Sequence, residues 1–155
     1  MSSVKIKHYT ESLYYELLLT SKYMKMFGTQ IFEQECIELS TEEFSTLDVI
    51  FCNPGICQRD LAKLILKDRA NTGRTLDVLE EKGFITRTLV ERNNRPIKQI
   101  EITQYGKDYL TKLSKVLREH FNDFNSGISE EELKQISAAL KKIRTHIGEI
   151  IKTQI

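Results

Sequence analysis

Three side chains between residues 69 and 77 carry groups that match the edges of DNA bases. Arg69 and Arg74 offer guanidinium groups, which suit guanine, and Asn71 offers an amide, which suits adenine. At helical spacing these three lie on one outward side together with Gly73 and Asp77. The pattern predicts a helix whose polar face contacts base edges in the major groove.

Polar and cationic side chains stand on both sides of this segment. Gln58, Arg59 and Lys63 precede it, and we expect them to face phosphates, which hold a protein on the duplex without reading its sequence. Arg92 and Arg95 follow it, and we expect them to reach phosphates or the neighbouring minor groove, with solvated charge as the alternative. All residues predicted to contact DNA are Gln58, Arg59, Lys63, Arg69, Asn71, Thr72, Gly73, Arg74, Arg92, Arg95 and Lys98.

The distribution of charge supports this prediction. The 155 residues contain 23 Lys and Arg against 22 Asp and Glu, a formal net charge of +1. Residues 1–56 carry four basic and eight acidic side chains, residues 57–98 carry ten and six, and residues 99–155 carry nine and eight. The positive charge is therefore concentrated in the middle of the chain. We expect modest non-specific affinity for DNA, because the remainder is neutral or acidic.

Three short helices are expected to position these groups. A Ser-x-x-Glu capping box at residues 40–43 predicts a helix from Thr41 to about Cys52. A second helix should run from about Gln58 to Leu66, and a third from about Arg69 to Lys82, where Gly83 ends it. The residues expected to face the core are Phe44, Leu47 and Phe51 or Val49 in the first helix, Leu61, Leu64 and Ile65 in the second, and Thr72, Leu76 and Leu79 in the third.

In the residues that follow, the spacing of apolar side chains changes from a period of about 3.6, typical of a helix, to a period of 2, typical of a strand. Residues 84–90 are β-branched and aromatic, residues 91–96 are polar, and residues 97–102 alternate apolar and polar side chains. This pattern predicts a β-hairpin with a charged tip. Gly73 lies inside the preceding helix at a cost of about 1 kcal/mol relative to Ala, and a close approach of backbone to DNA is one possible reason.

Long helices are expected on either side of this unit. An apolar series predicts one from about His8 to Ile37, Thr103 can cap one that runs to about Asn122, and a capping box at residues 129–132 begins the last. The last helix repeats apolar residues at spacings of 3, 4, 3, 4 and 3, which is typical of a helix-packing seam. These residues are Leu133, Ile136, Leu140, Ile143, Ile147 and Ile150.

The expected fold is therefore mainly α with a small β-hairpin wing. Residues 40–103 form a winged helix-turn-helix DNA-binding lobe, and residues 1–39 and 104–155 form a helical dimerisation frame around it. We expect one compact domain overall, because the sequence contains no interdomain linker.

Several motifs in residues 40–113 resemble the multiple-antibiotic-resistance regulator (MarR) family. They are Leu61-Ala62-Lys63-Leu64, Asp68-Arg69, Leu79-Glu80-Glu81-Lys82-Gly83-Phe84-Ile85, Arg87, Asn93-Asn94-Arg95 and Ile102-Thr103-Gln104-Tyr105-Gly106. The specific part is the combination of residues 79–83 before the wing with residues 102–106 after it. The resemblance implies a homodimeric transcription factor, usually a repressor, that binds a pseudo-palindromic operator and is released by a small phenolic ligand or by thiol oxidation.

The chain departs from the family pattern near the expected DNA contacts. Asn93-Asn94-Arg95-Pro96 replaces a wing of the form Asp-Asp-Arg-Arg, so one arginine carries over and an acidic partner for it is missing. Leu66-Lys67 stands where Gly followed by an apolar residue is common, and Thr72-Gly73 replaces Val-Thr. The operator sequence therefore cannot be taken from relatives.

Three cysteines offer a redox alternative. Cys57 is expected at a helix N-terminus, where the helix dipole favours a thiolate, and Cys52 or Cys36 could resolve its oxidised form. The simpler interpretation is a small side chain at a capping position and buried free thiols elsewhere. An odd number of cysteines without a Cys-x-x-Cys pair fits a reducing compartment, so we expect a cytoplasmic protein.

Aromatic residues crowd the first long helix, namely Tyr9 and the four candidate pocket residues Tyr14, Tyr15, Tyr23 and Phe27. In the family the ligand cavity borders the dimer frame, so these side chains could line a pocket for a small aromatic effector. Core packing or a dimer interface is the more common use of an aromatic stripe at helical spacing.

Other functional classes find little support. The sequence has no Gly-x-Ser-x-Gly, no phosphate-binding glycine loop and no metalloprotease motif, and its histidines lack metal-ligand spacing. We therefore expect no enzyme activity, no cofactor and no metal. No apolar run approaches membrane-spanning length, and no apolar stretch follows Lys5 and Lys7, so we expect neither a membrane span nor a secretory signal. A winged helix that binds protein instead of DNA is the alternative function.

Overall fold

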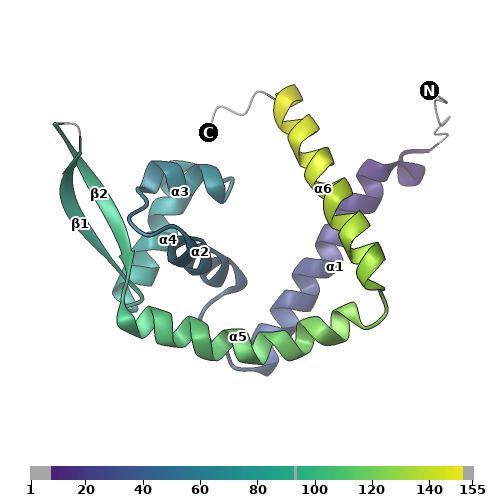
Figure 1. The fold of residues 1–155 in the computed structure, drawn as a ribbon, viewed down its shortest axis with the longest axis horizontal. Coiled ribbons are helices and arrows are strands. Elements are labelled where there is room, and N and C mark those ends of the chain that lie inside the picture. Colours follow the sequence, from purple (N-terminus) through teal and green to yellow (C-terminus); the bar gives the residue numbers. More distant parts are fainter. Residues whose placement is uncertain (1–7, 93, 152–155) are drawn as a thin grey trace. The chain divides into compact units, whose positions relative to one another are not determined.

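The computed structural model describes residues 8–92 and 94–151, apart from the side chains of Arg92 and Arg95. It falls into two compact units, residues 1–44 and residues 45–155. The elements along the described chain are a 3-10 turn (Tyr9–Glu11), α1 (Leu13–Gln34), α2 (Thr41–Cys52), α3 (Gln58–Leu64), α4 (Arg69–Glu81), β1 (Ile85–Arg92), β2 (Arg95–Ile102), α5 (Gln104–Asn125) and α6 (Glu130–Ile151) (Figure 1). The predicted class, mainly α with one hairpin, is confirmed.

The first helix is shorter than the expected span from His8 to Ile37. The Ser12 hydroxyl accepts from the Tyr15 N–H over 3.1 Å and donates to the Tyr9 carbonyl over 2.6 Å, so it ends the 3-10 turn and caps α1. At the other end Cys36 has a φ of 50°, and the Ile37 N–H donates back to the Phe32 carbonyl over 2.9 Å. This is a Schellman cap, which ends α1 three residues earlier than the apolar pattern suggests.

The second helix has the predicted bounds. In the capping box, the Glu43 N–H donates to the Ser40 hydroxyl over 3.2 Å and the Ser40 N–H donates to the Glu43 carboxylate over 2.9 Å. Leu47 is buried as expected, but Ile50 is the second large buried side chain and Phe51 is exposed. A helix buries one face only, and Ile50 lies one turn from Leu47 on that face.

The next two helices form the helix-turn-helix. Leu61 is buried as predicted, whereas Leu64 is exposed because α3 ends there and the chain turns away. In α4 the expected core residues Thr72, Leu76 and Leu79 are all completely buried.

The hairpin is longer and its turn tighter than expected. The strands pair in antiparallel register from Ile85 opposite Ile102 to Arg92 opposite Arg95. The Ile100 N–H also donates to the Ile56 carbonyl over 2.9 Å, and Cys57 bridges to Gln99, so the segment before α3 is tied to β2. The alternation of apolar and polar residues in the two strands could not reveal that residues 56 and 57 also pair with β2, because this extended segment is too short to show a pattern of its own.

The base of the hairpin closes onto the start of α5. The Thr103 hydroxyl accepts from the Gly106 N–H over 3.0 Å and donates to the Gly83 carbonyl over 2.7 Å. A Cβ on Gly106 would collide with the Phe84 carbonyl oxygen. The hydrogen bonds of Thr103 and the close contact at Gly106 account for these two residue types in the segment 102–106.

The last helix starts at the predicted capping box. The Ser129 N–H donates to the Glu132 carboxylate over 2.9 Å, and the Glu132 N–H donates to the Ser129 hydroxyl over 3.3 Å. None of the residues of α6 is buried, and Ile136, Ile147 and Ile150 are exposed. The apolar seam of α6 is thus only partly covered.

Candidate nucleic-acid interface

The N-terminus of α4 is fixed by its own capping residue. The Asp68 carboxylate accepts from the Asn71 N–H over 2.8 Å and also from the Asn71 side-chain amide. These hydrogen bonds lower the pKa of Asp68 below its ordinary value. The capped end presents Arg69, Asn71 and Arg74 as exposed side chains. Asn71 keeps its amide oxygen for another partner, since its N–H₂ group is directed to Asp68.

Thr72 does not belong with these exposed side chains. It is 0% exposed, and its hydroxyl donates to the Asp68 carbonyl over 2.8 Å. The prediction of an inward position is confirmed, and the prediction of a DNA contact through this side chain is wrong. A β-branched polar residue can satisfy its hydroxyl inside its own helix and pack its methyl group in the core.

Gln58 connects α3 to α4. Its side-chain amide donates to the Arg69 carbonyl over 2.9 Å. A Cβ on Gly73 would lie 3.1 Å from this same nitrogen. The structure thus gives an internal reason for Gly73, which leaves room for the Gln58 side chain against the first turn of α4.

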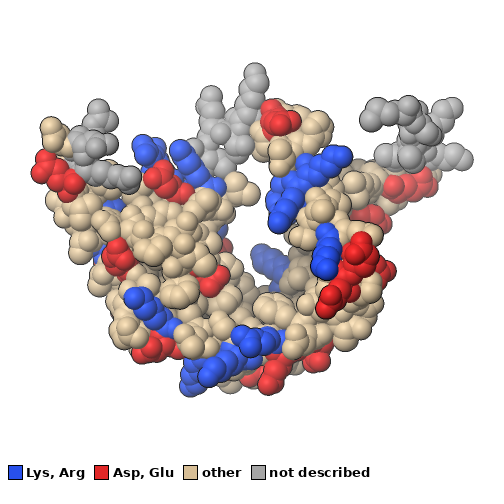
Figure 2. Space-filling view, in the orientation of Figure 1, with Lys and Arg blue, Asp and Glu red and all other residues tan. Residues whose placement is uncertain are grey.

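The outer side of α3 carries the cations that precede α4. Arg59 and Lys63 are exposed, and the Arg59 guanidinium lies 3.4 Å from the Asp60 carboxylate. Figure 2 shows basic side chains grouped over α3 with an acidic one beside them. On the hairpin Lys98 is exposed, whereas the predicted contacts of Arg92 and Arg95 rest on side chains outside the described part of the chain.

The sequence patterns gave no role to Arg87, which links β1 to α4. Its Nε donates to Glu80 Oε2 over 2.9 Å, its Nη2 donates to the same oxygen and to Asp77 Oδ1 over 2.7 Å, and its backbone N–H donates to Glu80 Oε1 over 3.0 Å. These bonds lower the pKa of Glu80 and raise the pKa of Arg87. The signal in the sequence was an acidic residue in the last turn of a helix and an arginine just beyond the Gly83 turn, but the pairing depends on the geometry of that turn.

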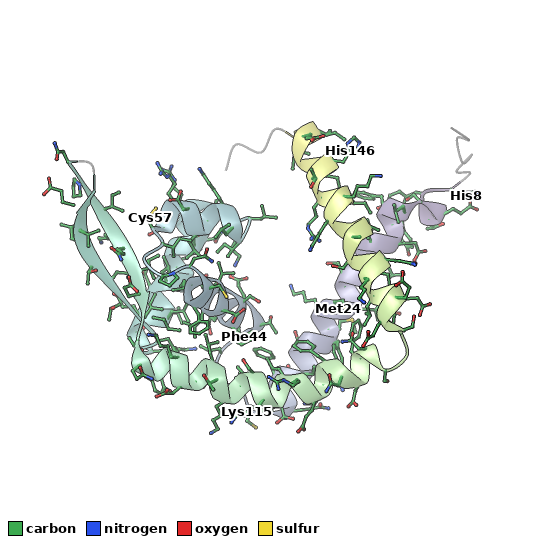
Figure 3. All side chains as sticks on the ribbon, viewed as in Figure 1. His8, Met24, Phe44, Cys57, Lys115 and His146 are labelled. Carbon is green, nitrogen blue, oxygen red and sulfur yellow. The ribbon has the colours of Figure 1, made fainter. Side chains whose placement is uncertain are left out.

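Cys57 lies at the start of α3 beside the hairpin (Figure 3). Its side chain accepts no capping bond, and its thiol donates to Asp60 Oδ2 over 3.1 Å. This hydrogen bond is the main cause of the lowered pKa of Asp60. A thiolate could not donate it and would face the carboxylate. Cys36 and Cys52 are exposed, which contradicts burial for these two thiols, and a redox role for the three cysteines stays a prediction.

The four aromatic residues of α1 differ in their exposure. Tyr14 and Tyr23 are exposed, whereas Tyr15 and Phe27 are half-buried. Two hollows on the first unit are lined by residues 29–41 and 22–33, and none of these four aromatic side chains lines either one. An effector pocket formed by them stays a prediction.

The described part of the chain contains no helix that is long and apolar enough to cross a bilayer. Nor do three or more His, Cys, Asp or Glu side chains within residues 8–92 and 94–151 gather where they could hold a metal ion.

Comparison with known proteins decides the family. The MarR family model matches residues 39–103. The HTH-type transcriptional regulator YybA of Bacillus subtilis (strain 168) is 36% identical over 115 residues, which cover 72% of this chain and 73% of that protein. The chain belongs to the MarR family.

Solved structures of transcription regulators share the fold of this MarR-family chain. The transcriptional regulator SlyA is 27% identical with a TM-score of 0.75, over 89% of this chain and 95% of that one. S. aureus MepR, solved as a complex with DNA, is 25% identical with a TM-score of 0.74, over 90% of this chain and 99% of that one. The chain is therefore a winged-helix transcriptional regulator, and its family is not a family of enzymes.

Proposed function

We propose that this regulator binds a pseudo-palindromic double-stranded DNA operator as a homodimer. Each protomer would insert α4 into the major groove of one half-site, with half-sites about one duplex turn apart. The observation that carries this proposal is the capped N-terminus of α4, which holds the exposed Arg69, Asn71 and Arg74 on a buried scaffold of Leu76 and Leu79. MepR, a relative of the same fold, was solved with DNA.

The proposed contacts divide into two classes. Arg69, Asn71 and Arg74 contact base edges, because guanidinium and amide groups match guanine and adenine. Arg59, Lys63 and Lys98 contact phosphates, because exposed cations attract the DNA backbone without regard to sequence. Arg92 and Arg95 of the wing complete the phosphate or minor-groove contacts.

The homodimer in this proposal is supported by the partly exposed apolar seam of α6. Six apolar residues at heptad spacing are incompletely covered along a 22-residue helix. A second copy would cover them and would set the distance between two α4 helices. Residues 1–39 and 104–155 would then act as the dimerisation frame and residues 40–103 as the DNA-binding lobe.

The regulatory part of the proposal is a repressor released by a small aromatic ligand or by thiol oxidation. Either event would alter the spacing of the two lobes and lower the population that fits the operator. Tyr14, Tyr15, Tyr23 and Phe27 are the proposed ligand contacts, and Cys57, Cys52 and Cys36 are the proposed redox residues. Because its target is chromosomal DNA, the proposal includes a cytoplasmic location.

The experiment starts from a random-sequence duplex pool, from which the wild-type protein selects its preferred site. Arg74→Ala should bind the selected duplex about tenfold or more weakly and relax the preference at one base pair. Lys63→Ala should weaken binding to every duplex alike and reduce the slope of log affinity against log salt by about one. Arg118→Ala, an exposed arginine on α5, is the matched control.

Failure of the wild-type chain to select any duplex would contradict the proposal. The alternative function is a wing that binds a protein partner. In that case neither duplex DNA nor Arg74→Ala should change the affinity of the chain for its partner.

A further inference from the structure

Arg87 lies on β1 at the outer limit of the contact between the hairpin and α4. Side chains alternate along a strand, so Ile85, Arg87 and Leu89 share one face of β1. Ile85 is 1% exposed, the Arg87 side chain is 18% exposed and Leu89 is 70% exposed. Arg87 is therefore the outermost residue on this face that is held against α4, and the rest of the wing projects beyond it.

The partners of Arg87 lie on α4 itself. Glu80 uses both carboxylate oxygens for the side chain and the backbone of this one residue, and Asp77, one turn earlier, accepts from the same guanidinium. The bonds therefore fix the strand backbone as well as the side chain. A planar guanidinium holds two carboxylates in a defined direction, which an ammonium cannot do.

The same contacts change the charge that α4 offers to DNA. Asp77 lies on the polar side of α4 with a side chain that is 65% exposed, one turn from Arg74. A free carboxylate there would repel phosphates. Bonded to Arg87, it points toward the hairpin, and Arg87 offsets one of the two negative charges of Asp77 and Glu80.

We propose that Arg87 is a positioning residue that fixes the wing relative to α4, so that both fit a single DNA site at once. This inference rests on the proposed function, because it concerns how two DNA-contacting elements act together. Arg87 needs no contact with DNA to do so. Without Arg87 the contacts of α4 and the contacts of the wing are no longer held in one geometry. Discrimination between DNA sequences then falls more than general affinity for DNA.

The test compares the duplex selected by the wild-type protein with a scrambled duplex of the same composition. Arg87→Met should lower affinity for the selected duplex about tenfold and affinity for the scrambled duplex by no more than the matched control. That control is Lys107→Met, which removes one positive charge from an exposed side chain on α5. Arg87→Lys keeps the charge but cannot bridge both carboxylates, and it should reproduce most of the loss of discrimination.

Two further measurements separate positioning from loss of charge or of folding. Amide hydrogen exchange of the free protein should become faster in β1 and β2 with Arg87→Met and remain unchanged in α5 and α6. Glu80→Gln should reproduce the loss, and Glu80→Gln combined with Arg87→Met should bind no more weakly than Arg87→Met alone, because both break one contact. Should Arg87→Met not fold, Glu80→Gln carries the test by itself.

An unchanged ratio of selected to scrambled affinity in Arg87→Met, or wild-type discrimination in Arg87→Lys, would overturn the positioning role. Either result leaves the proposed function intact, because that proposal fails only when the wild-type chain selects no duplex.

Discussion

Leu66 and Cys36 occupy backbone conformations in which glycine is the usual residue. Three helices of the described chain end in the same Schellman geometry, with Cys36, Leu66 or Gly83 at the left-handed position. The φ angles are 50°, 55° and 78°. Only Gly83 has the residue type that this position favours. The departure of Leu66 from the family's glycine therefore leaves the turn between α3 and α4 in place and strains it.

Leu66→Gly should raise the free energy of unfolding by about 0.5–1 kcal/mol. A left-handed conformation costs an L-residue roughly 1–2 kcal/mol, and the greater freedom of glycine in the unfolded chain cancels part of that gain. Leu66 is 70% exposed, so little burial is lost. Chemical denaturation at fixed protein concentration measures the difference.

Gly83→Ala is the matched control, and it should change the free energy of unfolding in the opposite direction. A Cβ there would meet no atom within 4 Å, so its cost reports backbone conformation alone. We expect a loss of about 1 kcal/mol. If both Leu66→Gly and Gly83→Ala lower the free energy of unfolding, the prediction for Leu66 is wrong. Leu66 would then make a contact that stabilises the protein by more than its backbone strain destabilises it.

At the scale of elements, a hydrogen bond from the Gln58 side-chain amide links α3 to α4. It has room to form because Gly73 has no Cβ. The Gln58 amide bonds the Arg69 carbonyl at 2.9 Å, and Gly73 leaves space for it. Gly73 weakens α4 by helix propensity, and the contact with Gln58 offsets this cost. The orientation of α4, the helix proposed to contact DNA, is thus coupled to a residue that the sequence alone assigned to phosphate contact.

A double-mutant cycle measures this coupling. In a Gln58→Ala background, Gly73→Ala should stabilise the protein by about 1 kcal/mol, because only helix propensity changes. In the wild-type background the gain should be smaller by about 0.5–1.5 kcal/mol, because the new methyl group displaces the Gln58 amide from its acceptor. Chemical denaturation of the four proteins gives both values, and equal effects in the two backgrounds would show that Gln58 and Gly73 are independent.

The elements themselves were largely predictable, because local signals determine them. Capping residues located the starts of α2, α4, α5 and α6, and Gly83 located the end of α4. The end of α1 was not predictable, since Cys36 lacks the usual residue type of its turn. Tertiary pairs such as Arg87 with Glu80, and the burial of Thr72, depend on how elements meet. Residue type and spacing alone therefore predicted candidate DNA contacts but could not show which side chains serve the fold.

At the scale of the molecule, the distribution of charge and apolar surface has a functional consequence. Residues 57–98 carry ten basic against six acidic side chains, and the whole chain has a net charge of +1. Among those cations, Arg87 is bonded to two carboxylates. We therefore expect one lobe to bind a duplex weakly, and the proposed operator binding to require two lobes held together.

Disruption of the α6 seam should then weaken DNA binding strongly without changing any residue proposed to contact DNA. Ile147→Glu places a carboxylate within the proposed interface, where a second copy would have to desolvate it. We expect sedimentation of the wild-type chain as a dimer at micromolar concentration and of Ile147→Glu as a monomer. Affinity for the selected duplex should fall by a factor of 100 or more, in line with loss of bivalent binding. Ser137→Glu, exposed on the same helix but outside the heptad positions, should remain dimeric and bind normally. A wild-type monomer would remove the homodimer from the proposal, and a monomeric Ile147→Glu protein with full affinity would show that a single lobe suffices.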